Sequence, residues 1–193
     1  GQEAYKGKWR EAFSHPVRPL YMELGTGKGR FIAGMSEAYP DANFVGFEVQ
    51  LGVIYYAAQK IFEGERNNAK VSLFDIAGIE EIVAPGEVDR FYINFCDPWP
   101  KAKHAKRRLT YHTFLDRYAR LLKDGGEVHF KTDNEGLFMF SLKECGWELK
   151  NVTYDLHSTD LPNVKTEYEE KFSKKGQPIF RLEAIKPKVQ KEA

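Results

Sequence analysis

Short apolar runs alternate with amphipathic segments along most of the chain. Runs rich in β-branched and aromatic residues, bounded by Gly, Pro, Asp or Asn, predict strands at residues 19–24, 43–49, 70–75, 89–95, 127–133, 151–156 and 178–185. Between them, residues 30–39, 51–63 and 111–123 carry apolar side chains three and four positions apart and are predicted to form helices. The last helix is predicted to end at Lys123 and the Gly125–Gly126 pair.

This alternation predicts an α/β fold class. Strands that alternate with helices and are mostly uninterrupted apolar runs are typical of a parallel sheet covered on both faces. Residues 157–177 are polar and charge-rich, without a strong helical period, so the two strands that flank them are expected to pair antiparallel at the sheet edge. A chain of 193 residues with 42% hydrophobic content can bury one such core, which predicts a single domain over residues 1–193.

Composition and charge narrow the function classes. The chain has 29 Lys and Arg against 28 Asp and Glu, so it is no bulk polycation and any anion site must be local. Cys96 and Cys145 have neither CxxC spacing nor nearby histidine pairs, which disfavours a disulfide framework and a zinc site and favours a reduced, cytoplasmic setting. No apolar run approaches the ~18 residues of a membrane span, so no membrane partner and no metal are expected.

The turn after the first strand is the first candidate binding site. It reads ELGTGKGR from Glu23 to Arg30 and opens a helix. A dinucleotide fingerprint needs Gly or Ala where Arg30 stands, and a Walker A loop needs Ser or Thr where Gly29 stands. The ExGxGxG pattern instead suits a ligand with an amino-acid moiety, which indicates S-adenosylmethionine. The residues predicted to hold it here are Glu23, Gly25, Gly27 and Gly29.

Two more carboxylates end the following strands. Glu48 closes the second strand, where a carboxylate can accept hydrogen bonds from both ribose hydroxyls. Asp75 closes the third strand and is expected to accept a hydrogen bond from the adenine amino group. Ordinary surface acids beside a Gly-rich turn would explain each residue alone, but three acids at successive strand ends favour a cofactor site.

The segment NFCDPWPKAKHAKRRLTY, residues 94–111, follows the fourth strand. We expect Asp97 to face the transferable methyl group, as the catalytic residue, in a loop stiffened by prolines. Trp99 could stack on a base or simply line the core. The basic run from Lys101 to Arg108 could be a solvated surface, the usual fate of such a run. Its place beside the predicted reaction centre of a nearly neutral chain favours a phosphate-binding role instead.

The strings YMELGTGKG, VGFEV, FYINFCDPWPKAKHAKRRLTY, VHFKTDN and TEYEEKF carry a resemblance to a known family. From about Tyr5 to Ile185 the chain resembles the bacterial tRNA (guanine-N7-)-methyltransferases, and the DPWPK-x-x-H-x-KRR string is the most selective match. The resemblance implies a class I S-adenosylmethionine-dependent methyltransferase fold, Rossmann-like, with a seven-stranded, mostly parallel sheet. It also implies tRNA as the partner, with guanine 46 of the variable loop as the acceptor.

The resemblance also implies roles for individual residues. Glu23, Glu48, Asp75 and Asp97 line the cofactor side. The substrate contacts are Lys101, Asp133, Thr166, Glu167, Tyr168 and Glu169, and the RNA contacts are Lys103, His104, Lys106, Arg107 and Arg108. The family usually opens with a basic segment ahead of Tyr5, which this sequence does not contain, so an N-terminal segment is expected to be absent from it. A monomer and a homodimer both stay open.

Guanine N7 has an in-plane lone pair and no proton, so its methylation needs positioning rather than a general base. A carboxylate, Asp97 or Asp133, would stabilise the cationic product, and Glu169 or Asp97 could read the N1–H and N2 amine. Two alternatives stay open: a methyltransferase acting on an exocyclic amine, whose [DN]PP[YFW] loop Asp97-Pro98-Trp99 resembles, and a non-catalytic RNA-binding subunit. The second would be expected to show an eroded glycine turn.

Overall fold

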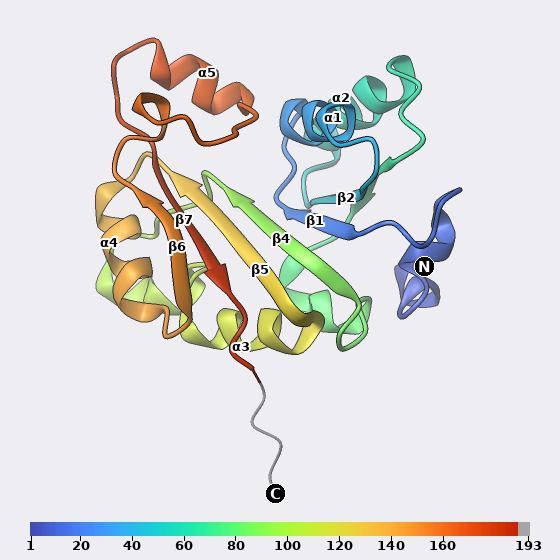
Figure 1. Cartoon of the computed structure of the whole chain (residues 1–193), viewed down its shortest axis with the longest axis horizontal. Helices are drawn as coiled ribbons and strands as arrows, with labels where there is room; N and C mark the ends of the chain where they lie inside the picture. Colours follow the sequence, from blue (N-terminus) through green and yellow to red (C-terminus); the bar gives the residue numbers. More distant parts are fainter. Residues whose placement is uncertain (189–193) are drawn as a thin grey trace, which may run out of the picture.

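A single seven-stranded sheet organises the molecule, in the strand order β3-β2-β1-β4-β5-β7-β6 (Figure 1). The computed structural model describes residues 1–188. Its strands are β1 Leu20–Leu24, β2 Asn43–Glu48, β3 Ala69–Leu73, β4 Val88–Asn94, β5 Leu122–Thr132, β6 Glu148–Thr153 and β7 Phe180–Ile185. Its α-helices are α1 Arg30–Ala38, α2 Leu51–Glu63, α3 His112–Leu121, α4 Glu135–Glu144 and α5 Glu167–Ser173. Short 3₁₀ helices are η1 Gln2–Tyr5, η2 Trp9–Ala12, η3 Ile76–Glu81, η4 Ala102–Arg107 and η5 Leu156–Ser158.

The strand directions confirm the predicted α/β class. β1 to β5 are parallel to one another, while β7 runs antiparallel to both β5 and β6. The chain returns from the β3 edge to place β4 beside β1, so the strand order reverses there. The predicted antiparallel pairing at the edge is confirmed, with β7 inserted between β5 and the edge strand β6.

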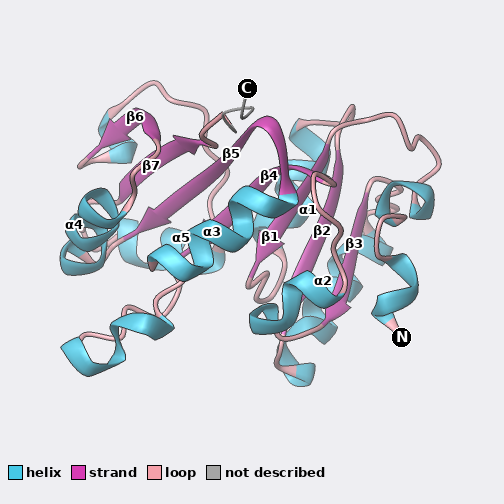
Figure 2. Ribbon diagram, turned by 90° about the horizontal axis from the view of Figure 1, so that it is seen from below, coloured by secondary structure: helices cyan, strands magenta, loops and turns pink. Residues whose placement is uncertain are grey.

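Apolar side chains cover both faces of the sheet. On one face, α3 and α4 pack on the strands through Leu115, Tyr118, Leu121, Leu137 and Phe138. On the other, α1 packs through Phe31, Ile32 and Met35 against Phe44 and Tyr92, with α2 beside it (Figure 2). Within residues 1–188 no helix has the length and apolar character required to cross a bilayer.

The expected end of the third predicted helix was wrong. The helix stops at Leu121, and Lys123 to Gly126 belong to β5, which begins five residues before the predicted start at Glu127. The register explains the error: Leu122 pairs with Val88 but Glu127 pairs with Arg90, so the residues between them bulge. Gly125 has φ +77°, and a Cβ on Gly126 would lie 2.8 Å from the Lys123 carbonyl oxygen. The glycines therefore serve a β-bulge instead of a helix end.

Two elements near the C-terminal end also differ from expectation. β6 begins at Glu148 rather than residue 151, and its pairing with β7 shifts between Lys150 and Thr153. Asn151 has φ 51°, so the ladder is interrupted at the residue where the strand was expected to begin. The polar stretch that follows contains α5, which the sequence analysis missed because seven residues are too few to show a helical period.

Candidate functional site: a cleft at the carboxyl ends of β1, β2 and β4

The glycine turn opens α1 as predicted. Gly25, Gly27 and Gly29 have φ values of +91°, +57° and +88°, which favour glycine. Nothing lies within 4 Å of a Cβ built on Gly25 or Gly27, so the backbone there faces open space. A Cβ on Gly29 would lie 2.6 Å from Ala57 in α2. The first two glycines therefore leave room for a ligand, and the third lets α1 and α2 approach each other.

A cleft of about 500 Å³ lies above this turn. It is within the range of small-molecule sites, roughly 300–1,000 Å³. The predicted residues that line it are Glu23, Gly25, Gly27, Glu48, Asp97, Arg107, Thr166, Glu167 and Tyr168. The structure thus brings three strand ends, the basic loop and α5 to one site.

Glu23 is a buried carboxyl group at the floor of the cleft. It is 4% exposed, and its two oxygens accept hydrogen bonds from Thr26 Oγ1 at 2.5 Å and Asn94 Nδ2 at 2.9 Å. Burial raises the pKa of Glu23 to about 7, against the lowering effect of these hydrogen bonds. A cationic group delivered into the cleft would stabilise the ionised carboxylate, as the ammonium of an amino-acid moiety does.

Glu48 is fixed at the rim by backbone amides. Its Oε1 accepts from Gly27 N at 3.0 Å, and its Oε2 accepts from Val49 N and Gln50 N, each at 3.0 Å. A carboxylate offers about four acceptor positions, so one is left for a ligand hydroxyl. The hydrogen bond from Glu48 to the ribose stays a prediction, and the free acceptor position is suitable for it.

Asp75 is placed differently from the other two acids. Its carboxylate accepts from Ala77 N at 3.0 Å and caps η3, while its neighbours Phe74 and Ile76 line the cleft. Val53 lines the cleft as well, and the sequence analysis missed these three apolar lining residues. The available signal was the apolar residues on both sides of Asp75.

The DPWP loop is held in a strained conformation beside the cleft. Phe95 and Trp99 have φ values of 54° and 44°, in the left-handed region that costs bulky residues about 1–3 kcal/mol each. Arg108 holds the loop: its guanidinium donates to the Pro98 oxygen at 3.2 Å and the Trp99 oxygen at 2.9 Å, and lies 4.5 Å from the centre of the Phe140 ring. Asp97, between the two strained residues, is exposed and lines the cleft.

The basic run divides into two groups. Arg107 lies over the Trp99 ring at 4.9 Å, His104 packs against the same ring at 5.7 Å, and Arg108 holds the loop. Lys101, Lys103 and Lys106 are exposed and form no ion pair within residues 1–188. The lysines are therefore available to an external anion. His104 and Arg108 help to shape the loop, and Arg107, which is also exposed, contacts the Trp99 ring. Trp99 is half-buried and lines the cleft, which leaves its stacking role a prediction.

The TEYE segment reaches the cleft from α5. Glu167 Oε1 accepts from Arg30 N at 2.9 Å, and the Tyr168 hydroxyl donates to Asp133 Oδ2 at 2.9 Å. Asp133 and Lys101 do not themselves line the cleft. Glu169 is fully buried and points away from it, toward Lys131.

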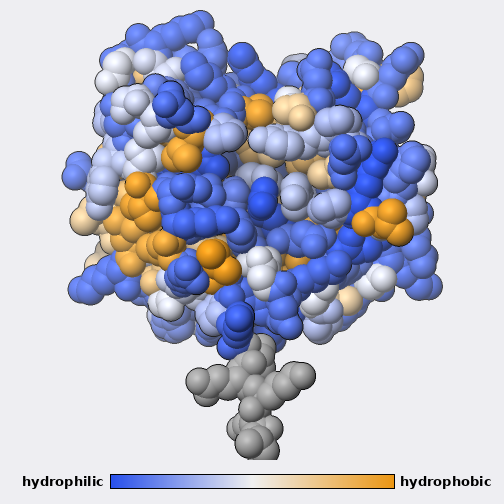
Figure 3. All heavy atoms as spheres, viewed as in Figure 1, coloured by the Kyte–Doolittle hydropathy of each residue, from blue (hydrophilic) through white to orange (hydrophobic). Residues whose placement is uncertain are grey.

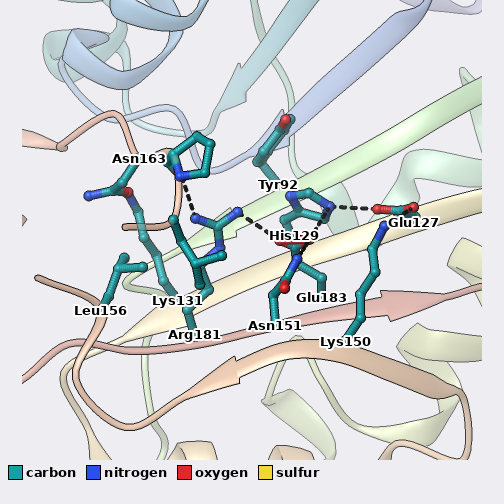
Figure 4. A network of polar contacts seen from close by, with 12 residues as sticks. Tyr92, Glu127, His129, Lys131, Lys150, Asn151, Leu156, Asn163, Arg181 and Glu183 are labelled. Atoms are coloured by element: carbon teal, nitrogen blue, oxygen red, sulfur yellow. Dashed lines mark hydrogen bonds and ion pairs between the residues drawn. The ribbon is translucent and has the colours of Figure 1, made fainter. Parts of the chain in front are cut away.

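A second polar cluster covers part of the sheet over β4, β5 and β7, under a cavity of about 250 Å³ (Figure 4). His129 Nε2 lies 2.8 Å from Glu127 and 3.7 Å from Glu183. These carboxylates are already paired with cations, since Lys150 contacts Glu127 and Arg181 contacts Glu183, each at 2.8 Å. The His129 hydrogen bond is the main cause that lowers the pKa of Glu127 to about 2. The cluster is thus an ion-pair network in which each carboxylate already contacts a cation. Figure 3 shows that the face of the molecule seen in Figure 1 is mostly hydrophilic, with a hydrophobic patch on its left side.

Comparisons with known proteins identify the family of the chain. A family model described as "Putative methyltransferase" matches residues 17–182. The curated "tRNA (guanine-N(7)-)-methyltransferase" of Streptococcus agalactiae serotype III is 50% identical over 94% of this chain and 88% of its own length. That of Streptococcus suis is 49% identical over 94% of this chain and 87% of its own length.

Solved structures show the same fold at low identity. A 16S rRNA (adenine(1408)-N(1))-methyltransferase from Catenulisporales acidiphilia aligns with a TM-score of 0.64 and 14% identity, over 100% of this chain and 94% of that one. A SAM-dependent methyltransferase from Aquifex aeolicus aligns with a TM-score of 0.59 and 15% identity, over 89% and 85%. The fold is therefore that of the class I methyltransferases, and the extent of sequence identity shows that this chain belongs to the bacterial tRNA (guanine-N7-)-methyltransferase family.

Proposed function

We propose that this protein transfers a methyl group from S-adenosylmethionine to N7 of guanine in the variable loop of tRNA, at position 46. The observation that carries the proposal is the convergence of Glu23, the open glycine turn, Glu48 and Asp97 on one cleft beside exposed lysines. Relatives named for this reaction are 50% identical to the chain. Donor, acceptor and RNA backbone each find complementary groups at this site.

The residues of the cleft fit S-adenosylmethionine. Glu23 is a buried carboxyl group that can pair with the amino group of the methionine moiety, and Gly25 and Gly27 leave space above the backbone. Glu48 would accept from the ribose hydroxyls, and Phe74 and Ile76 would enclose the adenine ring. When bound, the donor supplies an electrophilic methyl group on a sulfonium.

The chain itself contributes orientation and charge. N7 carries no proton to remove, so the residues must hold the guanine ring with N7 at roughly 3 Å from the methyl carbon, opposite the sulfur. Asp97, on a loop fixed by Arg108, would face the ring as it becomes cationic and stabilise the transition state. Lys101, Asp133, Thr166, Glu167 and Tyr168 are proposed to contact the substrate, and Lys103, His104, Lys106, Arg107 and Arg108 to serve the RNA side.

Analysis of nucleosides from tRNA tests the function. Unmodified tRNA is incubated with the protein and isotopically labelled S-adenosylmethionine, digested, and analysed by mass spectrometry. The proposal requires labelled 7-methylguanosine, absent when the guanine at position 46 is replaced. Labelled methyladenosine or methylcytidine would identify the exocyclic-amine alternative, and no labelled nucleoside would identify a non-catalytic RNA-binding subunit.

Glu48→Ala is expected to weaken donor binding by about 1–3 kcal/mol, the range for charged hydrogen bonds. The substitution removes an acceptor from the ribose and also frees Gly27 N, which Glu48 holds at 3.0 Å. Calorimetry with S-adenosylhomocysteine measures the change in Kd. Glu11→Ala, at an exposed position in η2, is the control and should bind like the wild type. An unchanged Kd for Glu48→Ala would remove Glu48 from the donor site.

Compared with the wild type, the Glu23→Gln variant is expected to be more stable at pH 8 than at pH 5 when no ligand is bound. Burial raises the pKa of Glu23 from 4.5 to about 7, so the folded state binds more protons than the unfolded state between these values. The wild-type free energy of unfolding therefore falls as the pH rises through this window, by up to about 3 kcal/mol. Glutamine does not ionise and should not show this loss.

Urea denaturation of both proteins at pH 5 and pH 8 measures this effect. The difference between the two proteins cancels the contributions of other titrating groups, such as His129. We expect the variant to gain stability over the wild type at pH 8 by about 1–3 kcal/mol more than at pH 5. Parallel pH profiles would show that Glu23 ionises in the folded protein as easily as in the unfolded chain.

A further inference from the structure

The segment that carries Thr166, Glu167 and Tyr168 to the cleft is an irregular strap, residues 156–169, between β6 and β7. It runs beside α1 and leads into α5, which lies beyond the carboxyl ends of β4 and β5 (Figure 1). Val164 packs on Gly34, where a Cβ would come within 2.6 Å of it. Regular backbone pairing does not hold this segment in place, so its position depends on side-chain contacts.

Lys131 of β5 is the centre of those contacts. Its ammonium lies 2.6 Å from Glu169 Oε1 and donates to Asn163 Oδ1 at 2.8 Å and the Val164 oxygen at 2.7 Å. In Figure 4 its side chain extends from the sheet toward Asn163. The ammonium thus donates two hydrogen bonds to the strap and forms an ion pair with Glu169 Oε1, a buried oxygen without a hydrogen-bond partner in residues 1–188. The Lys131 side chain is 5% exposed.

Glu169, the partner of Lys131, also contacts several residues of the strap. Its Oε2 is 2.5 Å from His157 Nε2 and accepts from Asn163 Nδ2 at 2.7 Å. Its own backbone N–H donates to Thr166 Oγ1 at 2.9 Å, which caps α5. With 0% of its side chain exposed, Glu169 has no free path to a base in the cleft.

The residues just before Glu169 depend on this anchor for their direction. Glu167 meets the start of α1 at Arg30 N, and the Tyr168 ring lies 5.0 Å from the Phe95 ring of the strained loop. Both line the cleft. If α5 shifted by one residue, Tyr168 would take the place of Glu169 beside Lys131 and would no longer face the cleft.

Stability alone does not explain a charged pair at this position. Apolar residues of similar volume often replace a buried ion pair without loss of stability. What apolar residues cannot supply is register, because the Lys131 donors and Glu169 acceptors match particular strap positions. The pair is therefore suited to fix which strap residues meet the cleft.

We propose that Lys131 and Glu169 are positioning residues, which hold the strap so that Thr166, Glu167 and Tyr168 contact the target guanine, and that neither touches the substrate. This inference rests on the proposed function and changes the role expected of Glu169 from substrate contact to anchor.

The test uses Lys131→Met, Glu169→Gln and the double variant, with Lys150→Met as the control. Lys150 is also an ion-paired lysine of the sheet, but it contacts Glu127 and lies outside the strap. Each single variant leaves one buried charge without its partner, whereas the double variant leaves none, so the double variant keeps the test valid if a single variant does not fold.

In the folded variants we expect amide hydrogen exchange in residues 157–173 to accelerate about tenfold or more, with β1 to β4 unchanged. The kcat for tRNA should fall about tenfold or more, while the KM for tRNA and the Kd for S-adenosylhomocysteine change less than about threefold. The double variant should be no slower than the slower single variant, because the two residues act as one unit. Lys150→Met should match the wild type.

Three results would overturn the inference. In the first, Glu169→Gln loses activity while its amide exchange stays unchanged, and the kcat of the double variant falls by the product of the two single effects. That result would show that Glu169 contacts the substrate directly. Wild-type activity in the double variant would show a purely structural pair. Exchange that is unchanged in all variants would show that the pair does not hold the strap. The exchange measurement needs no substrate, so it stands even if the wild type forms no 7-methylguanosine and the proposed function fails.

Discussion

Asp97→Asn is expected to slow methyl transfer to tRNA by about 10²–10³-fold, the usual effect of removing one preorganised electrostatic group from an active site. Asp97 is exposed at the end of β4, lines the cleft, and stands between two residues whose backbone is strained. Asparagine keeps the size of the side chain but lacks the negative charge that opposes the positive charge developing on the guanine ring. The loss should therefore fall on the chemical step.

Single-turnover rates with saturating tRNA and donor measure that step directly. Binding of S-adenosylhomocysteine and the melting temperature should stay close to the wild-type values, because the Asp97 carboxylate forms no hydrogen bond within residues 1–188. Asp116→Asn, an exposed carboxylate in α3, is the matched control. A variant at position 97 that methylates at nearly the wild-type rate would make Asp97 a structural loop residue and remove it from the mechanism.

The sequence predicted best those site residues whose place in the fold follows from the local pattern alone. The glycine turn, the strand-end acids Glu23 and Glu48, and Asp97 were all placed at one edge of the sheet because parallel strands present their carboxyl ends together. Local pattern was enough for these positions. The structure adds the pKa of Glu23 and the amide contacts of Glu48, which depend on packing.

Local pattern failed where tertiary contacts decide the conformation. The pair Gly125–Gly126 looks like a helix end, but a register shift between β4 and β5 makes it a bulge. The seven residues of α5 are too few to show a helical period. The helix is held by hydrogen bonds of Glu167 and Tyr168 and by the ion pair of Glu169, each with a distant part of the chain. The same dependence hid the burial of Glu169, since TEYE reads as four exposed residues until Lys131 is placed beside it.

The basic run shows the same limit within one loop. Its five predicted RNA contacts are alike in sequence, but the structure separates Lys103 and Lys106, which are exposed, from Arg108, which is bonded to the Pro98 and Trp99 carbonyls. One loop therefore combines a carboxylate with many cations because some cations hold the carboxylate in place and others face the solvent. The two groups should respond differently to substitution.

Replacing both Lys103 and Lys106 with Ala is expected to raise the KM for tRNA about tenfold and to leave kcat and donor affinity nearly unchanged. Each lysine that neutralises a phosphate should also contribute roughly 0.7–0.9 to the slope of log K against log salt concentration. The double variant should therefore bind tRNA with a slope smaller by up to roughly 1.4–1.8. Filter binding or fluorescence anisotropy over a series of salt concentrations measures both quantities.

Arg108→Ala is the comparison that makes this result specific. Loss of its contacts releases the strained backbone around Asp97, so kcat should fall while the salt slope changes by less than that of the lysine variant. A lysine variant with an unaltered salt slope would show that Lys103 and Lys106 only face solvent. The RNA would then have to approach over Thr166, Glu167 and Tyr168 instead, because these residues also line the cleft. An Arg108 variant that reduces the salt slope as much as the lysine variant would contradict the division of the loop. The main role of the Arg108 guanidinium would then be to bind a phosphate and not to hold the loop.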